Sequence, residues 1–197
     1  MATTTKKGEE TKSRIIQAAA ELFERRGYYG TGMNEILSRA SAPKGSAYFH
    51  FPGGKDDVAI HAIQFAGKQI GDLLKAGLAV EQNPHKIMGV LVGFFKMRLV
   101  QEDFRCGCPV GTVGLELSGT DSPVLDACKS TYLQWSQILA DYLSVHIDEA
   151  KAGEVADAAF SMIQGGLMVS RINSDLSHLD IVEKYCTALV VDTISGT

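Results

Sequence analysis

Apolar residues recur along most of this chain at the three- and four-residue spacing of an amphipathic helix. In the first segment of this kind, from about residue 10 to residue 26, Ile15, Ala19, Leu22 and Phe23 form one stripe, which predicts a helix with a single buried face. Alternating runs rich in Val, Ile and Thr, which are typical of strands, are absent from the sequence. The pattern therefore predicts an all-α fold.

The same spacing predicts eight further helices. We expect them at about residues 33–40 and 43–51, from residue 55 onward, and at about residues 84–102, 109–117, 123–146, 148–172 and 179–194. Gly27 and the run Pro52-Gly53-Gly54 break the chain between the first four helices. The apolar face expected for the fourth helix consists of Val58, Ala62, Ile63, Ala66, Ile70, Leu73 and Leu74.

The second and third helices are short and are joined by a tight turn, which is the layout of a helix-turn-helix module. The second member of such a pair lies in the DNA major groove. Ala47 and Phe51 are four residues apart and are expected to face the core. Gly45 leaves the backbone open to close approach. The side chains then left to face DNA are Lys44, Ser46, Tyr48, Phe49 and His50.

Lys55 stands at the predicted start of the fourth helix. A cation there opposes the helix dipole by about 0.3–1 kcal/mol. A DNA phosphate beside the helix would remove the conflict, since helix N-termini bind anions. The alternative is that the Lys55 side chain simply extends into water.

One run of residues in this segment is distinctive. It consists of Ile15-Ile16-Gln17-Ala18-Ala19-Ala20-Glu21-Leu22-Phe23, then Gly27-Tyr28, Thr31, Ile36, Ala40, Lys44-Gly45-Ser46, Tyr48, His50-Phe51 and Lys55. With this run, residues 11–63 resemble the N-terminal domain of the TetR/AcrR family of transcriptional regulators. The resemblance implies that DNA is contacted by Thr31, Lys44, Ser46, Tyr48, His50 and Lys55.

Three shorter segments are similar to the LmrA/YxaF-like branch of that family. They are Ala42-Pro43-Lys44-Gly45-Ser46, Pro52-Gly53-Gly54-Lys55 and Gly107-Cys108-Pro109-Val110. The sequence also departs from the family pattern, because Gly32 stands where Ser or Thr usually caps the second helix. We expect this helix to be capped less well.

The resemblance further implies an all-helical homodimer that binds palindromic operator DNA and whose C-terminal half binds a small effector. We therefore expect a flexible arm at residues 1–8, a helix-turn-helix domain at residues 9–54, and a larger helical effector-binding and dimerisation domain at residues 55–197. The last two helices are rich in small and apolar residues, and Gly165-Gly166 would let a partner helix approach closely. The alternative is that their apolar stripes close the subunit's own core.

Apolar, aromatic and Met side chains between these parts are typical of a cavity for a drug-sized ligand. The candidate ligand contacts are Phe65, Phe94, Met97, Trp135, Ile138 and Met162. For any single one of them, core packing is the simpler explanation. The resemblance implies a repressor, and these side chains suggest that a small apolar or aromatic ligand releases it from its operator.

Charge is unevenly distributed along the 197 residues. Residues 1–66 hold nine Lys/Arg and seven Asp/Glu, a net charge of +2, whereas the whole chain has a net charge of −4. A basic N-terminal part on an acidic remainder is typical of a nucleic-acid-binding module joined to another domain. No apolar run reaches the length of a membrane span and residues 1–8 do not look like a secretory signal, so we expect a cytoplasmic protein.

Cys106-Gly107-Cys108 raises a second hypothesis, in which the chain is a thiol-dependent enzyme or a redox sensor. Neither a second such pair nor a His pair at zinc-ligand spacing accompanies it. The sequence also lacks a recognisable nucleophile–base constellation and a Gly-rich phosphate loop. We therefore expect no enzymatic activity and no metal or other cofactor. A third hypothesis is a helical adaptor without a DNA role.

Overall fold

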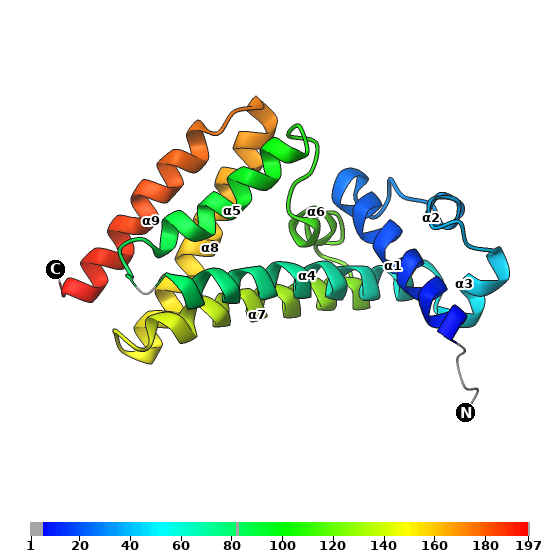
Figure 1. Ribbon diagram of the computed structural model, residues 1–197, viewed down its shortest axis with the longest axis horizontal. Helices are drawn as coiled ribbons and strands as arrows, with labels where there is room; N and C mark the ends of the chain where they lie inside the picture. The colour runs from blue at the N-terminus through cyan, green and yellow to red at the C-terminus, as the bar shows by residue number, and fades with distance from the viewer. Residues whose placement is uncertain (1–5, 82, 197) are drawn as a thin grey trace. The chain divides into compact units, whose positions relative to one another are not determined.

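The computed structural model describes residues 6–81 and 83–196 (Figure 1). Within these residues it contains nine α-helices and no β-strand, which confirms the predicted all-α fold. The helices are α1 Lys6–Arg26, α2 Met33–Arg39, α3 Lys44–His50, α4 Lys55–Val80, α5 Ile87–Gln101, α6 Pro109–Glu116, α7 Pro123–Leu143, α8 Glu149–Asn173 and α9 Ser177–Ser195.

The chain forms two compact units, and the long helices α4 and α7 each contribute to both. One unit comprises the chain up to Lys68 together with Pro109–Thr131, and the other comprises Gln69–Cys108 and the chain from Tyr132 onward. This division differs from the expected boundary between residues 54 and 55, because α6 packs against α1 and so joins the N-terminal helices. Where the DNA-binding domain ends in functional terms stays a prediction.

Local sequence signals explain the ends of the first helices. Gly27 follows α1 with a left-handed φ of 72°, and Arg26 lies in the last turn before it, as is common at a helix C-terminus. Gly32 is the N-cap of α2, and no side chain caps that helix. Pro43 is the N-cap of α3 with a φ of −65°, the angle that its ring imposes.

Several predicted limits differ from the structure. Helix α1 begins at Lys6, so residues 6–8 are helical rather than part of a flexible arm, and residues 1–5 lie outside the described residues. Helix α5 begins at Ile87 instead of residue 84, because residues 84–86 form a turn in which the His85 amide donates to Asn83 Oδ1. Helix α7 ends at residue 143 rather than 146. Leu73 is 52% exposed and does not belong to the buried face of α4.

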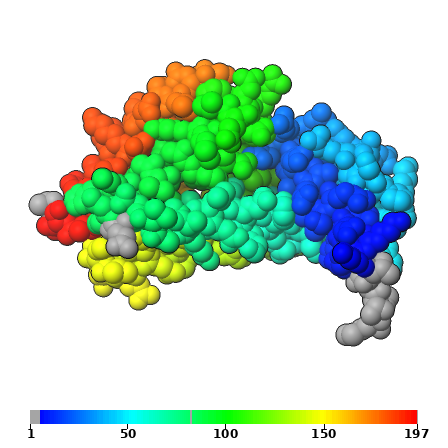
Figure 2. Space-filling model, in the orientation of Figure 1, coloured from blue at the N-terminus to red at the C-terminus, as the bar shows by residue number. Residues whose placement is uncertain are grey.

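In the second unit α5 and α9 lie side by side (Figures 1 and 2), and α8 packs against both. Lys96 of α5 forms ion pairs with Asp180 at 2.7 Å and Glu183 at 2.5 Å, both on α9. Partial burial disfavours the charged form of Lys96, but the two carboxylates outweigh it and raise the pKa of Lys96. This bridge ties the two helices together.

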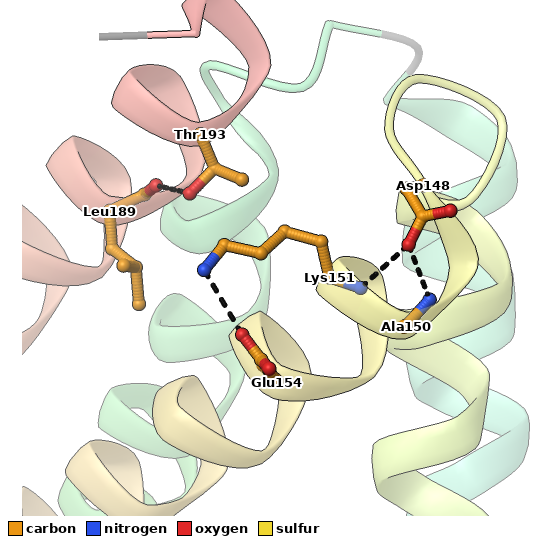
Figure 3. A network of polar contacts seen from close by, with 6 residues as sticks. All are labelled: Asp148, Ala150, Lys151, Glu154, Leu189 and Thr193. Atoms are coloured by element: carbon orange, nitrogen blue, oxygen red, sulfur yellow. Dashed lines mark hydrogen bonds and ion pairs between the residues drawn. The ribbon is translucent and has the colours of Figure 1, made fainter.

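Helix α8 has a side-chain cap at its start (Figure 3). Asp148 Oδ1 accepts hydrogen bonds from the amides of Ala150 at 3.0 Å and Lys151 at 3.3 Å, which satisfies two of the four unpaired amides of a helix N-terminus. In the same view Lys151 pairs with Glu154 at 3.0 Å, and both side chains are more than half exposed. Such an exposed pair contributes little to stability.

Two glycines of α8 offer a matched test of the packing between α8 and α9. A Cβ on Gly166 would lie 2.7 Å from Val182 Cγ2, whereas a Cβ on Gly153 would meet nothing within 4 Å. We expect Gly166→Ala to lower the free energy of unfolding by about 1–2 kcal/mol through overpacking. Gly153→Ala should raise it by up to about 1 kcal/mol through helix propensity. Urea unfolding followed by circular dichroism measures both, and a stabilising Gly166→Ala would contradict the packing described.

Candidate nucleic-acid interface

Helix α3 presents an exposed polar and aromatic face because two apolar residues hold it against the helices behind it. Ala47 and Phe51 are 2% and 0% exposed, as predicted, and α3 packs against α1 and α2. On the other side Tyr48 and Phe49 are 75% and 63% exposed. Neighbouring aromatic side chains with such exposure indicate a binding surface, since large aromatic residues are mostly buried.

The remaining predicted contacts on α3 share this surface. Lys44 and Gly45 are exposed, and Ser46 and His50 are partly exposed. The His50 ring lies edge-on to the Phe49 ring, with the centroids 5.0 Å apart. Among the described residues no acidic side chain pairs with Lys44, so its charge is available to an anionic partner. The structure therefore brings six of the eight predicted DNA contacts together on one short helix.

Thr31 lies elsewhere. It is 1% exposed, and its hydroxyl donates to the Gly27 carbonyl at 2.8 Å. The side chain thus supports the turn between α1 and α2 from inside. Its position gives no support to the DNA contact that the resemblance implies.

Lys55 is held against the protein instead of extending into water. Its Nζ lies 4.1 Å from the centroid of the Tyr28 ring, whose hydroxyl donates to the carboxylate of Asp56. Partial burial lowers the pKa of Lys55, and the charges of Asp56 and Glu116 oppose that shift. The ring face stabilises a cation that the helix dipole disfavours. The ammonium is therefore positioned at the start of α4, and its contact with a phosphate stays a prediction.

Several arginines of the same module are engaged within it. Arg26 pairs with Glu35, Arg39 pairs with Glu21, and Arg14 Nε donates to the Ala40 carbonyl at 3.0 Å. These contacts link α1 to α2 and to the residue that follows α2. They use basic side chains to hold the module together.

A contact between residues far apart in the chain joins this module to α6. Oε2 of Glu116, the last residue of α6, accepts hydrogen bonds from the amides of Tyr28 at 2.6 Å and Tyr29 at 3.0 Å. Some 88 residues separate Glu116 from Tyr28. No periodicity or motif connects residues so far apart.

The predicted ligand contacts are divided between the two units. Phe65 belongs to one unit and the other five residues to the second. Trp135 is 1% exposed, whereas Met97 is 50% exposed, and Phe94, Ile138 and Met162 are intermediate. An open surface pocket of about 290 Å³ is lined by Lys75, Leu78, Ala79, Ile138, Asp141 and Tyr142. Of the predicted contacts, Ile138 alone lines this pocket.

The cysteines lie in the interior. Cys106, Cys108, Cys128 and Cys186 are buried and none of them forms a disulfide, and Cys106 Sγ lies 3.6 Å from the carboxylate of Glu102. Burial raises the pKa of the Cys186 thiol to about 11, which disfavours the reactive thiolate. In the part of the chain that the structure describes, no group of three His, Cys, Asp or Glu side chains is placed to hold a metal ion. These environments do not favour a thiol enzyme.

None of the described helices combines the length and apolarity that crossing a membrane requires.

Two family models match this chain. The model of bacterial regulatory proteins of the tetR family matches residues 15–62, which include α2, α3 and the start of α4. The model of the C-terminal domain of LmrA/YxaF-like transcriptional regulators matches residues 84–185. The first match covers the surface described above, and the second covers most of the remaining helices.

Individual proteins resemble the chain over most of its length. The HTH-type transcriptional regulator LmrA of Bacillus subtilis is 33% identical over 166 residues, which are 82% of this chain and 86% of LmrA. YxaF of the same species is 28% identical over 92% of this chain and 95% of its own. Among solved structures, a TetR transcriptional regulator of Chloroflexus aurantiacus superposes with a TM-score of 0.81 at 21% identity, covering 96% of this chain and 98% of that one. A TetR regulatory protein of Rhodobacter sphaeroides gives 0.79 at 21% identity, over 90% and 97%.

Proposed function

Because the chain belongs to the TetR family of bacterial transcriptional regulators, with a C-terminal domain of the LmrA/YxaF-like type, we propose that it is a repressor which a small apolar or aromatic ligand releases from its operator. The observation that carries the DNA-binding part is the exposed face of α3. There Lys44, Tyr48 and Phe49 point outward while Ala47 and Phe51 are buried. A regulator of this kind acts on the chromosome, so we place it in the cytoplasm, and its relatives and fold favour a protein without enzymatic activity.

The side chains of this surface suit distinct parts of a DNA duplex. We propose that Lys44 and Ser46, in the first turn of α3, contact base edges, with Gly45 allowing the backbone to approach. Tyr48 and His50 carry hydrogen-bonding groups on flat rings and suit phosphates or thymine methyl groups. Lys55, at the start of α4, suits a phosphate.

Loss of the α3 contacts tests DNA binding directly. A duplex selected from a random pool by the wild-type protein serves as the probe, and its affinity is measured by fluorescence anisotropy over a range of salt concentrations. We expect Lys44→Ala with Tyr48→Ala to weaken binding by at least about tenfold and to lower the magnitude of the salt slope by about 1, because one phosphate or base contact of Lys44 is lost. Lys129→Ala removes the same charge from an exposed position of α7 and should leave the affinity unchanged. A wild-type protein that enriches no duplex even at low salt overturns the proposal.

The last two helices are proposed to form the dimer interface. Gly166 is already used within the chain, since it faces Val182 and Leu179 of α9, whereas Gly165 faces open space. Large apolar side chains remain exposed on the same two helices, namely Met168, Ile172, Ile181 and Tyr185 at 53–72% exposure. Helix α9 thus has one buried stripe and a second exposed one, as expected if another helix pair covers it. A twofold dimer doubles the DNA contacts and reads half-sites about 34–36 Å apart.

A charge on this face is expected to separate the subunits. Tyr185→Glu should raise the dimer dissociation constant at least about 100-fold, because an unpaired carboxylate would be buried at the interface. Leu133→Glu places the same charge on an exposed apolar position of α7, 70% exposed, and should leave the dimer intact. Sedimentation velocity distinguishes the two states. Wild-type protein that sediments as a monomer, or a dimeric Tyr185→Glu variant, would contradict this interface.

For release, we propose a shift between two populated conformations. Helix α4 runs without interruption from Lys55, at the DNA-facing end, to Val80 in the second unit, so a ligand that favours one orientation of α4 alters the spacing of the recognition helices. Such coupling requires about 1–3 kcal/mol of differential affinity. Phe65, Phe94, Met97, Trp135, Ile138 and Met162 are the proposed ligand contacts. The family match over residues 84–185 supports a sensory role for this half.

The fluorescence of Trp135, the one tryptophan of the chain, provides the test for a ligand. A panel of small aromatic compounds should contain members that change its emission saturably and release the selected duplex. Ile138→Ala should weaken such a compound by about tenfold through lost apolar contact, while Leu133→Ala, on the exposed side of the same helix, should not. Compounds that release the duplex without changing the Trp135 emission, and that act on the Ile138→Ala variant as strongly as on the wild type, would disprove this site.

A further inference from the structure

The turn between α1 and α2 is held by a carboxylate from a helix far away in the sequence. Oε2 of Glu116 accepts from the Tyr28 amide at 2.6 Å and from the Tyr29 amide at 3.0 Å. All three residues belong to the same compact unit, in which α6 packs against α1. The contact therefore joins the end of α6 to the turn that precedes α2 of the helix-turn-helix module.

Gly27 makes room for this carboxylate. Its φ of 72° turns the chain out of α1, and successive backbone amides after such a residue form a concave site for an anion. A Cβ on Gly27 would lie 1.9 Å from Glu116 Oε1. A glycine is thus required twice, by the backbone conformation and by the position of the carboxylate.

The same turn positions groups that face DNA. The ring of Tyr28 lies under the Lys55 ammonium and its hydroxyl donates to Asp56, so one residue of the turn holds the start of α4. The hydroxyl of Thr31 closes the turn onto the Gly27 carbonyl, and α2 begins two residues later, at Met33. Fixing the backbone at residues 28–29 therefore fixes both α2, which carries α3 behind it, and the N-terminus of α4.

We propose that Glu116 is a positioning residue for DNA recognition, through which α6 sets the arrangement of α2, α3 and the start of α4. Glu116 is an exposed residue, so its carboxylate can leave the two amides for water when α6 moves, without the penalty of stranding a buried charge. The inference rests on the proposed DNA-binding function and adds the route by which a movement of α6 reaches the recognition helix.

Two substitutions at one position separate hydrogen bonding from charge. Glu116→Ala and Glu116→Gln both remove the negative charge, but glutamine retains an oxygen that can accept from the amides of Tyr28 and Tyr29. On the duplex selected by the wild-type protein, we expect Glu116→Ala to weaken binding by about tenfold, a typical coupling between sites, and to leave binding to a random duplex nearly unchanged. Glu116→Gln should stay within about threefold of the wild type, since the acceptor is kept. Asp126→Ala, which removes an exposed acidic partner of Lys129 on α7, is the control and should bind as the wild type does.

A double-mutant cycle with Gly27 shows whether the effect passes through this contact. Gly27→Ala displaces the Glu116 carboxylate, so adding Glu116→Ala to Gly27→Ala should cause no further loss of affinity. Amide hydrogen exchange of Tyr28 and Tyr29 should be faster in Glu116→Ala than in Glu116→Gln. All affinities are measured well below the melting temperature of each variant, which circular dichroism determines, so that a change in the ratio of selected to random duplex binding reports on recognition and not on global unfolding.

The results of these experiments distinguish a failure of the role proposed for Glu116 from a failure of the DNA-binding function. If Glu116→Ala binds the selected duplex as the wild type does, or if it and Glu116→Gln change together, the proposed role of Glu116 is wrong while the DNA-binding function stands. Additive effects of Gly27→Ala and Glu116→Ala likewise contradict it. If the wild-type protein itself selects no duplex, the DNA-binding function fails, and the role of Glu116 with it.

Discussion

The surface that would face DNA depends on the burial of Ala47 and Phe51. Helix α3 has seven residues, and an isolated helix of that length is not stable in water because nucleation is costly. Its conformation therefore comes from packing against α1 and α2. The burial of a phenylalanine side chain contributes about 1.5–3 kcal/mol, and here it also fixes which side of α3 points outward. The exposure of Lys44, Tyr48 and Phe49 is a consequence of that anchoring.

Basic residues in this module serve two different purposes. Arg14, Arg26 and Arg39 make contacts within the module, and guanidinium groups suit such roles because they offer several donors in a fixed geometry. Lys44 and Lys55 present a single ammonium each, one exposed on α3 and one held over the Tyr28 ring. The net charge of +2 in the first 66 residues therefore does not describe the surface of α3, because Glu21 and Glu35 are paired with Arg39 and Arg26 on α1 and α2 and Lys44 is exposed.

Local rules accounted for much of the fold and for the exposed part of the site. Gly27, Pro43 and Gly54 mark chain breaks by their own backbone preferences, and the spacing of Ala47 and Phe51 identifies the inward side of α3. Rules of this kind fail where the partner is distant. The burial of Thr31 follows from the closure of its turn, and the exposure of Leu73 follows from which side of α4 other helices cover. The hydrogen bonds of Glu116 with the amides of Tyr28 and Tyr29 depend on the packing of α6 against α1, which no local pattern encodes.

Tyr28 connects the backbone of one turn with the start of another helix. Its amide is held by Glu116, its ring lies under Lys55, and its hydroxyl donates to Asp56. Burial and the hydrogen bond to Asp56 raise the pKa of its hydroxyl, so the hydroxyl stays protonated at neutral pH and can donate.

The free energy of a contact that transmits a conformational change must be comparable to the coupling free energy between the sites, about 1–3 kcal/mol. Hydrogen bonds to a partly solvated carboxylate are of that order, whereas a deeply buried ion pair would hold one arrangement permanently. The exposure of Glu116 therefore suits it to a reversible role. The contacts of Tyr28 with Lys55 and Asp56 hold the start of α4 in a fixed position relative to the turn.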